Sequence, residues 1–493
     1  WAQLQQQRVG QVQVRADLRD VALESTSGLL DATGGKRIAR ASHERVQVEA
    51  RLRKDANGWQ LDAPVLRLRR DGQTARLDGL RMRFGDAIEI RAPDLDASTS
   101  ASLLALSDHV PEKFRAWLLQ AQPGVVLRDL RVSGRARQWR ASARVEDFQL
   151  QPHGQQPGIS GLSGWLAMDD RGGVLRLSPT GKARFDWPVG LRQPLDLELA
   201  GNLVWWREGK GWTVAAQGLQ VRSEGFGMDV HAELGLQGDG SAPTLDLAAT
   251  LQPVTFATAK KFWIMHKMPP TTVKWLDDAL VQGQVADGRI IIAGDLDDWP
   301  FRQSEGRFDA RANIRGATLR FSPDWPVGEA MDAAVVFNGP GFTVEGKAVL
   351  AGNTITSLKG GIVDFKQPWL DLALVSQGQG EKLRALMLAS PLKQRYGEHL
   401  QAATIAGPAN VDLELALPLG KALGERRING RLELRKARLA DSRWDIDFAD
   451  VSGFTHFSEQ GFATQNLAVK FEQQSAVFNL RVGEAFTGGP GLA

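Results

Sequence analysis

The residues of this 493-residue chain that are best able to do chemistry are seven histidines. They are His43, His109, His153, His231, His266, His399 and His456. No two of them stand at the i, i+4 spacing that places two imidazoles on one metal ion. We therefore interpret each histidine as a surface or turn residue and predict no metal site.

A second candidate for chemistry is the acidic group Asp295, Asp297 and Asp298, which crowds three carboxylates beside Trp299. Such a group could hold a cation or supply a general acid and base. No EF-hand loop pattern follows it, and short polar residues are typical of turns. We expect the polar end of a β-hairpin here.

Two glycine-containing stretches resemble known catalytic or binding motifs only in part. The stretch from Gly161 to Gly164 contains a serine but lacks the spacing of a nucleophile elbow, so we interpret it as a hairpin turn. Gly378-Gln379-Gly380 precedes a predicted helix but has no third glycine to cradle a phosphate. The chain also has no cysteine, which excludes disulfides and thiolate chemistry. We predict no catalytic residue, no cofactor and no enzymatic activity.

The stretch from Lys260 to Met268 mixes basic and large apolar side chains. This combination suits a membrane surface or a lipid headgroup, and it equally suits packing across an open sheet end. Three tryptophans, Trp187, Trp299 and Trp325, each precede a proline near a predicted turn. We expect them to anchor hairpin corners rather than to stack on carbohydrate.

Composition favours a folded chain with no strong demand for a charged partner. Hydrophobic residues make up 43% and charged residues 24%. Lys and Arg number 60 against 57 Asp and Glu, which gives no support for nucleic-acid binding. No apolar stretch approaches the ~18 residues of a membrane-spanning helix. Since the chain begins at Trp1, we expect it to be part of a longer protein whose membrane anchor lies outside it.

The elements that must position these residues are predicted by strict alternation of apolar and polar side chains, which recurs along the chain and is typical of β-strands with one dry face. Such alternation favours antiparallel sheet, because parallel sheets are buried on both faces. We predict an elongated, curled antiparallel sheet of repeated meanders whose apolar face forms a hydrophobic groove. The predicted lining residues are Val46, Val48, Leu52, Leu80, Met82, Phe84, Leu195, Leu197, Leu199, Leu245, Leu247, Leu251, Val335, Phe337, Leu370, Leu372, Leu374, Val411, Leu413, Leu415 and Leu417.

Three short segments interrupt the alternation with helical periodicity, and each lies close to a proline. We expect them to pack against the groove through Phe114, Trp117, Leu118, Trp275, Leu276, Leu280, Leu383 and Met387. DWPVG also occurs twice, at Asp186 and Asp324, which supports internal repetition. We predict four segments of one continuous groove, a β-meander at 1–100 and helical inserts followed by meanders at 101–255, 256–380 and 381–493.

The stretch from Pro269 to Phe301, with Trp275-Leu276 near its start and Trp299-Pro300-Phe301 at its end, resembles the central region of the YhdP family. This family is AsmA-like and related to TamB. The sequence from Ser390 to Leu392 and the strand from Leu413 to Leu419 resemble the next part of the same family. The likeness covers most of the chain.

The resemblance implies a periplasmic protein, anchored to the inner membrane, that carries phospholipid toward the outer membrane in a long apolar groove. Its implied partners are phospholipid acyl chains and, through regions outside this chain, the two membranes. Alternation alone leaves other functions open, because an open groove and a closed sandwich both bury one face of every strand. The alternatives are a scaffold that holds client β-strands for envelope assembly and a β-rich enzyme such as a glycan hydrolase.

Overall fold

The computed structural model describes residues 2–5, 8–30, 36–56, 58–98, 101–107, 110–135, 138–237, 241–303, 305–419 and 424–483. These residues form 29 β-strands, six α-helices and three short 3-10 helices. The contacts divide the chain into two units, 1–245 with 261–267 and 246–260 with 268–493. The predicted mainly β, antiparallel fold is therefore confirmed, whereas the division into four segments stays a prediction.

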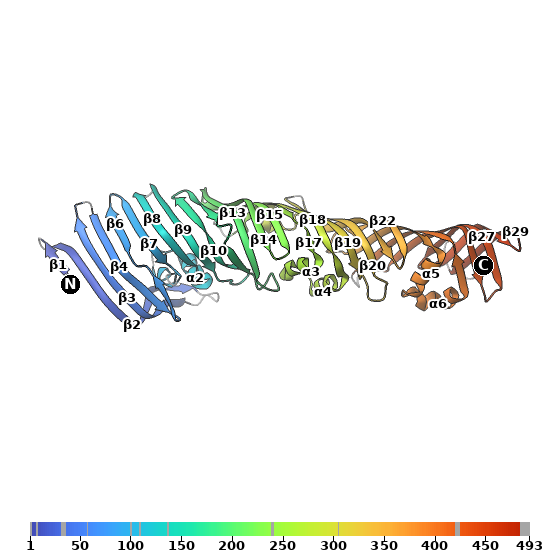
Figure 1. Ribbon diagram of the computed structural model, residues 1–493, viewed down its shortest axis with the longest axis horizontal. Coiled ribbons are helices and arrows are strands. Elements are labelled where there is room, and N and C mark those ends of the chain that lie inside the picture. Colours follow the sequence, from blue (N-terminus) through green and yellow to red (C-terminus); the bar gives the residue numbers. More distant parts are fainter. Residues whose placement is uncertain are drawn as a thin grey trace. The chain divides into compact units, whose positions relative to one another are not determined.

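The first unit is a meander of antiparallel strands (Figure 1). Every strand pairs with a strand that comes one or two places before or after it along the chain. Its strands are β1 (Ala2–Gln5), β2 (Arg8–Leu30), β3 (Lys36–Asp55), β4 (Gly58–Arg70), β5 (Gln73–Arg76), β6 (Leu80–Gly85), β7 (Ile88–Asp96), β8 (Gly124–Arg135), β9 (Gln138–Leu150), β10 (Gly158–Asp169), β11 (Gly172–Leu177), β12 (Lys182–Asp186), β13 (Leu195–Glu208), β14 (Gly211–Ser223) and β15 (Phe226–Leu236).

The second unit repeats this architecture, and the boundary between the units falls within β16 (Thr244–Leu251). Its other strands are β17 (Val254–Thr255), β18 (Leu280–Asp295), β19 (Arg307–Leu319), β20 (Gly328–Asn338), β21 (Gly341–Leu350), β22 (Asn353–Ile362), β23 (Trp369–Gln379), β24 (Ala403–Ala406), β25 (Pro408–Pro418), β26 (Arg427–Asp441), β27 (Ile446–Ser458), β28 (Gly461–Phe471) and β29 (Gln474–Gly483). Antiparallel neighbours alternate in direction, so hairpin turns lie at both ends of the strands.

Helices interrupt each meander where sequence periodicity predicts them. They are α1 (Ala101–Leu104), α2 (Glu112–Ala121), α3 (Phe256–Ala259), α4 (Pro270–Ala279), α5 (Gly380–Leu388) and α6 (Leu392–Ala402), with η1 (Lys260–Phe262) and η2 (Met265–Lys267) between α3 and α4 and η3 (Leu296–Asp298) after β18. A proline stands directly before α2, α4 and α6, where its fixed φ favours a helix start. Helix α4 ends at Ala279, so Leu280 begins a strand rather than closing a helical face.

The three helical insertions are attached to the sheet in the same way. The last residue of α2, Ala121, accepts a hydrogen bond from Gln151 N at 2.7 Å, just beyond the following hairpin. Ala279 of α4 accepts from Arg320 N at 2.8 Å, and Ala402 of α6 accepts from Ser442 N at 3.3 Å. Within each unit the α-helices lie beside the strand ends on one side of the sheet, which we call the helix edge. The strand ends on the other side form the hairpin edge (Figure 1).

The register shows that the strands have one apolar and one polar face. Leu370, Leu372 and Leu374 on β23 lie directly opposite Leu417, Leu415 and Leu413 on β25. Directly opposite residues of antiparallel strands share a face, so these leucines form one apolar surface. On the other face, Arg431 and Asp412 form a 2.5 Å ion pair across β25 and β26. The predicted alternation is therefore confirmed at these strands.

A row of β-bulges crosses the strands of each unit between its two edges. In the second unit the bulges centre on Gly316, Lys436 and Asn466, which all have positive φ. The freed N–H of each bulge donates to a side chain of the next strand, respectively Asp332 (3.0 Å), Ser452 (2.9 Å) and Asn479 (2.6 Å). Bulges bend a strand and increase its twist, so a row of them bends the whole sheet along one line.

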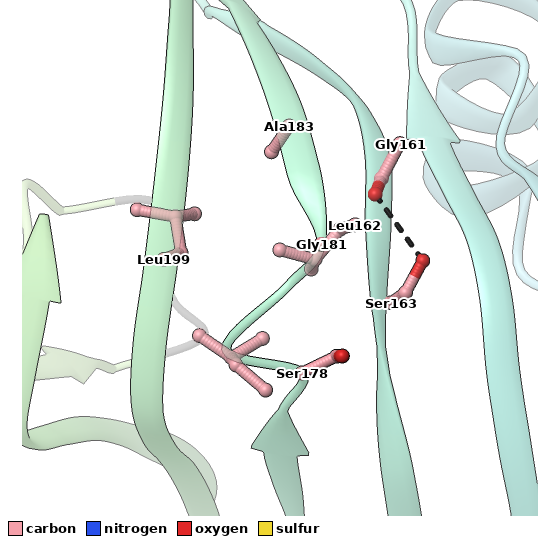
Figure 2. Close-up of a pocket in the computed structure, with 8 residues that line it drawn as sticks. Gly161, Leu162, Ser163, Ser178, Gly181, Ala183 and Leu199 are labelled. Atoms are coloured by element: carbon pink, nitrogen blue, oxygen red, sulfur yellow. Dashed lines mark hydrogen bonds between the residues drawn. The ribbon is translucent and has the colours of Figure 1, made fainter. Parts of the chain in front are cut away.

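The first unit has the same row of bulges, and Figure 2 shows one of them in β10. There Gly161 has a φ of 76°, its N–H donates to Asp147 Oδ1, and its carbonyl accepts from Ser163 Oγ at 3.3 Å. The stretch from Gly161 to Gly164 thus lies inside a strand, and its interpretation as a hairpin turn was wrong. Glycine signals a turn in sequence, but here its positive φ serves a bulge.

Replacing Asp332 should show that a side chain from the next strand maintains the bend. The Gly316 N–H, with Arg315 and Lys347 nearby, holds the pKa of Asp332 below its ordinary 3.8. The stability from this lowered pKa is present above 3.8 and is lost as pH falls through the folded value. We expect Asp332→Ala to lower the urea midpoint more than Asp332→Asn, which still has an acceptor. In the isosteric Asn variant, the free energy of unfolding should also fall less as the pH is lowered. Equal urea midpoints for the Ala and Asn variants would contradict this role.

Candidate functional site: the apolar face

The predicted lining residues of the second unit gather on one continuous apolar face. Val335 lies opposite Val344, and Phe337 lies opposite Phe342. Leu374 lies opposite both Leu358 and Leu413. The face also includes members that the sequence reasoning missed, which are Phe342, Val344, Leu358, Ile428 and Leu432. Glycines interrupt the alternation of apolar and polar residues on these strands. The side chain of Leu372 covers Gly360, and the ring of Phe457 covers Gly430.

In the first unit the register likewise joins the predicted residues to unpredicted neighbours. Val46 lies between Leu18 and Leu68, and Met82 lies between Leu61 and Ile90. Leu195, Leu197 and Leu199 of β13 lie opposite Phe185, Ala183 and Val221. Leu247 and Leu251 belong to the second unit and Leu245 to the first. The predicted set is therefore distributed over the apolar faces of both units.

Most of these large apolar side chains are only half-buried. Among the predicted lining residues, Leu195 and Val411 are buried, Phe84 and Phe337 are exposed, and the others are half-buried. Much apolar surface that a sandwich would cover is therefore open to solvent.

The part of the face near the helix edge is packed more tightly. Ala409, Leu434, Ala437, Val451, Leu467 and Val469 form a buried cluster in the second unit. Leu383 of α5 packs against this cluster. In the first unit Leu162, Leu177 and Ala183 form a smaller cluster, beside the narrow depression of Figure 2, which has no room for a water molecule. The packed strip thus follows the bulge row and extends toward the helix edge, and the open strip of the same face lies between it and the hairpin edge.

Helix α5 is fixed in place by buried polar contacts. Asn353 is buried, and its amide donates to the carbonyls of Leu350, Ala351 and Lys382. Arg384 Nε donates to Leu400 O at 2.7 Å, which joins α5 to α6. Buried, satisfied polar groups of this kind specify one arrangement. The α5–α6 pair therefore has a fixed position beside the packed strip.

The other predicted helical residues have varied positions. Leu118 is buried against Ala105 between α1 and α2, with Trp117 packed beside them. Phe114 is exposed and stacks on Trp117 with 5.3 Å between ring centroids. Trp275 is exposed, and its indole N–H donates to Phe321 O at 3.0 Å. Leu276 and Met387 are half-buried.

Among the described residues, the histidines and the group Asp295, Asp297 and Asp298 are not gathered into one site. His43 is 2% exposed, so its interpretation as a surface residue was wrong; burial, with Arg70 nearby, lowers its pKa. His231 accepts from Gly218 N and His266 contacts Trp187, while His109 lies outside the described residues. Asp295 caps η3 at the β18–β19 connection, as expected of a polar hairpin end. The part of the chain described here has no group of three or more His, Asp or Glu arranged to hold a metal ion.

The basic and aromatic stretch from Lys260 to Met268 packs on neighbouring protein at several points. In the first unit Phe262 stacks on Phe226 at 4.3 Å, and Met265 N donates to Gly190 O at 2.8 Å. In the second unit Lys260 Nζ donates to Asp277 O. None of the helices in the described ranges is both long and apolar enough to cross a membrane.

The polar face carries exposed ion pairs. Lys359 and Glu345 lie 3.8 Å apart, and Arg45 binds Asp17 through two hydrogen bonds. The Arg45 guanidinium lowers the pKa of Asp17 to about 2. Exposed pairs of this kind add little stability and keep the face in contact with water.

These features define a class of protein, in which each unit is an antiparallel meander with one solvated face and one apolar face that has an open strip. The chain belongs to the YhdP family, because the family model described as YhdP protein matches residues 1–487. It is 22% identical over 446 residues to the intermembrane phospholipid transporter YhdP of Escherichia coli (strain K12), which covers 86% of this chain. The chain spans 35% of the length of that relative. A search of solved structures finds no significant match.

Proposed function

We propose that the open strip of the apolar face is a groove that binds phospholipid acyl chains and conducts them between the inner and outer membranes. The observation that carries the proposal is the half-buried state of the large leucine, valine and phenylalanine side chains on one face. Soluble proteins rarely leave apolar patches of this extent uncovered unless they bind something. The relative's role as an intermembrane phospholipid transporter supports phospholipid as the ligand class.

The energetics favour a continuous apolar path. Each CH₂ group that leaves water contributes about 0.8 kcal/mol, so two long acyl chains contribute more than ~20 kcal/mol. A lipid that crosses water unaided would lose this free energy. A row of similar leucines offers nearly equal binding at successive positions, so a lipid can move along it without a large barrier.

The location and partners follow from the same proposal. The protein acts in the periplasm, is anchored to the inner membrane, and reaches both membranes through regions outside this chain. Its role is non-enzymatic, because it moves lipid and leaves every covalent bond intact.

A photo-crosslinking amino acid tests the proposal directly. Placed at Leu247, Leu372 or Leu413, it should capture phospholipid from Gram-negative cells, detected by mass spectrometry of the purified adduct. At Asp246 or Asp371, each next to a test position but with its side chain on the opposite face, it should capture none. Equal capture at both faces, or capture of protein strands alone, would contradict the groove and favour a scaffold.

A further inference from the structure

Aromatic side chains gather at the hairpin edge of the apolar face in the second unit. The ring centroids of Phe337 and Phe342 lie 5.6 Å apart, and Phe342 stacks on Phe365 with 6.0 Å between ring centroids. The ring centroids of Trp299 and Phe308 lie 4.9 Å apart. Trp299, Phe337 and Phe365 are exposed by 42%, 37% and 48%. We call these five residues the aromatic rim.

The rim belongs to the same surface as the open strip. Phe337 and Phe342 lie opposite each other, and Val335 and Val344 come next toward the bulges on the same face. Arg302 forms an ion pair with Asp364, which joins the two loops that carry Trp299 and Phe365. The exposed rings are therefore held in place by their neighbours.

The first unit carries an independent example of this arrangement. Trp59 lies opposite Phe84 near the β3–β4 and β6–β7 turns, and Phe84 is exposed. Trp212 is exposed at the β13–β14 turn, and the Trp205 ring lies over Gly173. Here too the strand ends near the hairpin turns carry aromatic rings on the apolar face.

The depth of the open strip matches the length of an acyl chain. From Phe342 to the register shift at Gly346 and Ala348 the strand advances four to six residues. At ~3.4 Å per residue this distance is about 14–20 Å. One leaflet of a bilayer has a hydrocarbon thickness of about 15 Å, half of the ~30 Å core.

We propose that the aromatic rim binds the glycerol and headgroup end of the phospholipid, and that the acyl chains run along the strands from this rim to the bulge row. Aromatic rings favour the boundary between hydrocarbon and water, which is where the glycerol lies in a bilayer. The inference rests on the proposed function and adds to it an orientation: lipids lie across the groove, side by side along its length. The opposite arrangement, with chains parallel to the groove axis, would give the rim and the deeper leucines equal contact with all parts of a chain.

Fluorescence quenching at single cysteines distinguishes the two orientations, because the chain has no cysteine of its own. Phe342→Cys reports on the rim. Leu374→Cys and Leu358→Cys report on the level of Gly346, four residues deeper, because Leu358 pairs with both Gly346 and Leu374. Ala373→Cys, on the polar face, is the matched control. Each variant of the whole chain is labelled with bimane and loaded from phosphatidylcholine vesicles that carry a doxyl group near the carbonyl or near the methyl end.

At Phe342→Cys we expect stronger quenching by the doxyl near the carbonyl, and at both deeper positions stronger quenching by the doxyl near the methyl end. The orientation would be overturned if the ratio of quenching by the two doxyl groups were the same at Phe342→Cys and at the deeper positions. Quenching above that of Ala373→Cys would in that case still support the groove. No quenching above that control at any position would overturn the groove as well. Circular dichroism of each variant checks its fold, and the two deep positions replace each other if one variant is unstable.

Discussion

Leu467→Ala should lower the free energy of unfolding by about 3 kcal/mol, whereas Leu415→Ala should lower it by about 1 kcal/mol or less. Leu467 is 1% exposed in the buried cluster beside α5, so its truncation leaves a cavity. Leu415 is half-buried on the open strip and loses less contact with protein. Urea unfolding of both variants, followed by circular dichroism, gives the comparison.

Comparison of Leu467→Ala with Leu415→Ala tests whether the face has a packed strip and an open strip. Both substitutions remove the same atoms from strands of the same sheet, so their difference reports on the surroundings alone. A cost of about 3 kcal/mol at Leu415 would mean that another layer of protein covers the open strip. That result would remove the physical basis of the proposed groove.

Leu372→Asp should reduce the amount of co-purifying phospholipid at least ~10-fold, which corresponds to about 1.4 kcal/mol of binding free energy. The carboxylate removes a leucine from the proposed lipid path and sets an unpaired charge against acyl chains. Since Leu372 is half-buried, the fold should tolerate the change. Lipid content is measured by extraction and mass spectrometry of the purified protein.

Ala373→Asp is the control for this prediction. It adds the same carboxylate one residue further along β23, on the polar face opposite Lys359. We expect this variant to keep its lipid. If Leu372→Asp unfolds the chain while Ala373→Asp does not, the leucine row is a protein-packed core and the transport proposal fails.

The strands are predictable from the sequence because each has one solvated face. Leu370, Leu372 and Leu374 alternate with polar or small residues, and this period of two identifies their shared side. Their cross-strand partners Leu413, Leu415 and Leu417 follow the same rule, so alternation alone is enough to predict both rows. The three helical insertions are predicted by their prolines and their helical spacing.

The bend of the sheet could not be predicted in this way. Gly316 and Gly161 resemble turn residues, and Lys436 carries no signal of the positive φ that it adopts. A bulge depends on an acceptor from a neighbouring strand, such as Asp332 for Gly316, and this pairing is known only when the register is known. For the same reason the sequence did not separate the buried Val411 from the half-buried Leu413, two residues away on the same face.

The bulge row has a consequence for how members of this family can differ in size. Each bulge and the side chain that accepts its N–H lie on neighbouring strands, as Gly316 with Asp332 and Lys436 with Ser452 do. The curvature is thus specified hairpin by hairpin and not by contacts between distant parts of the sequence. Duplication or loss of whole hairpins would change the number of strands in a unit while the cross-section of its sheet, and hence the proposed fit to one acyl chain, stayed constant.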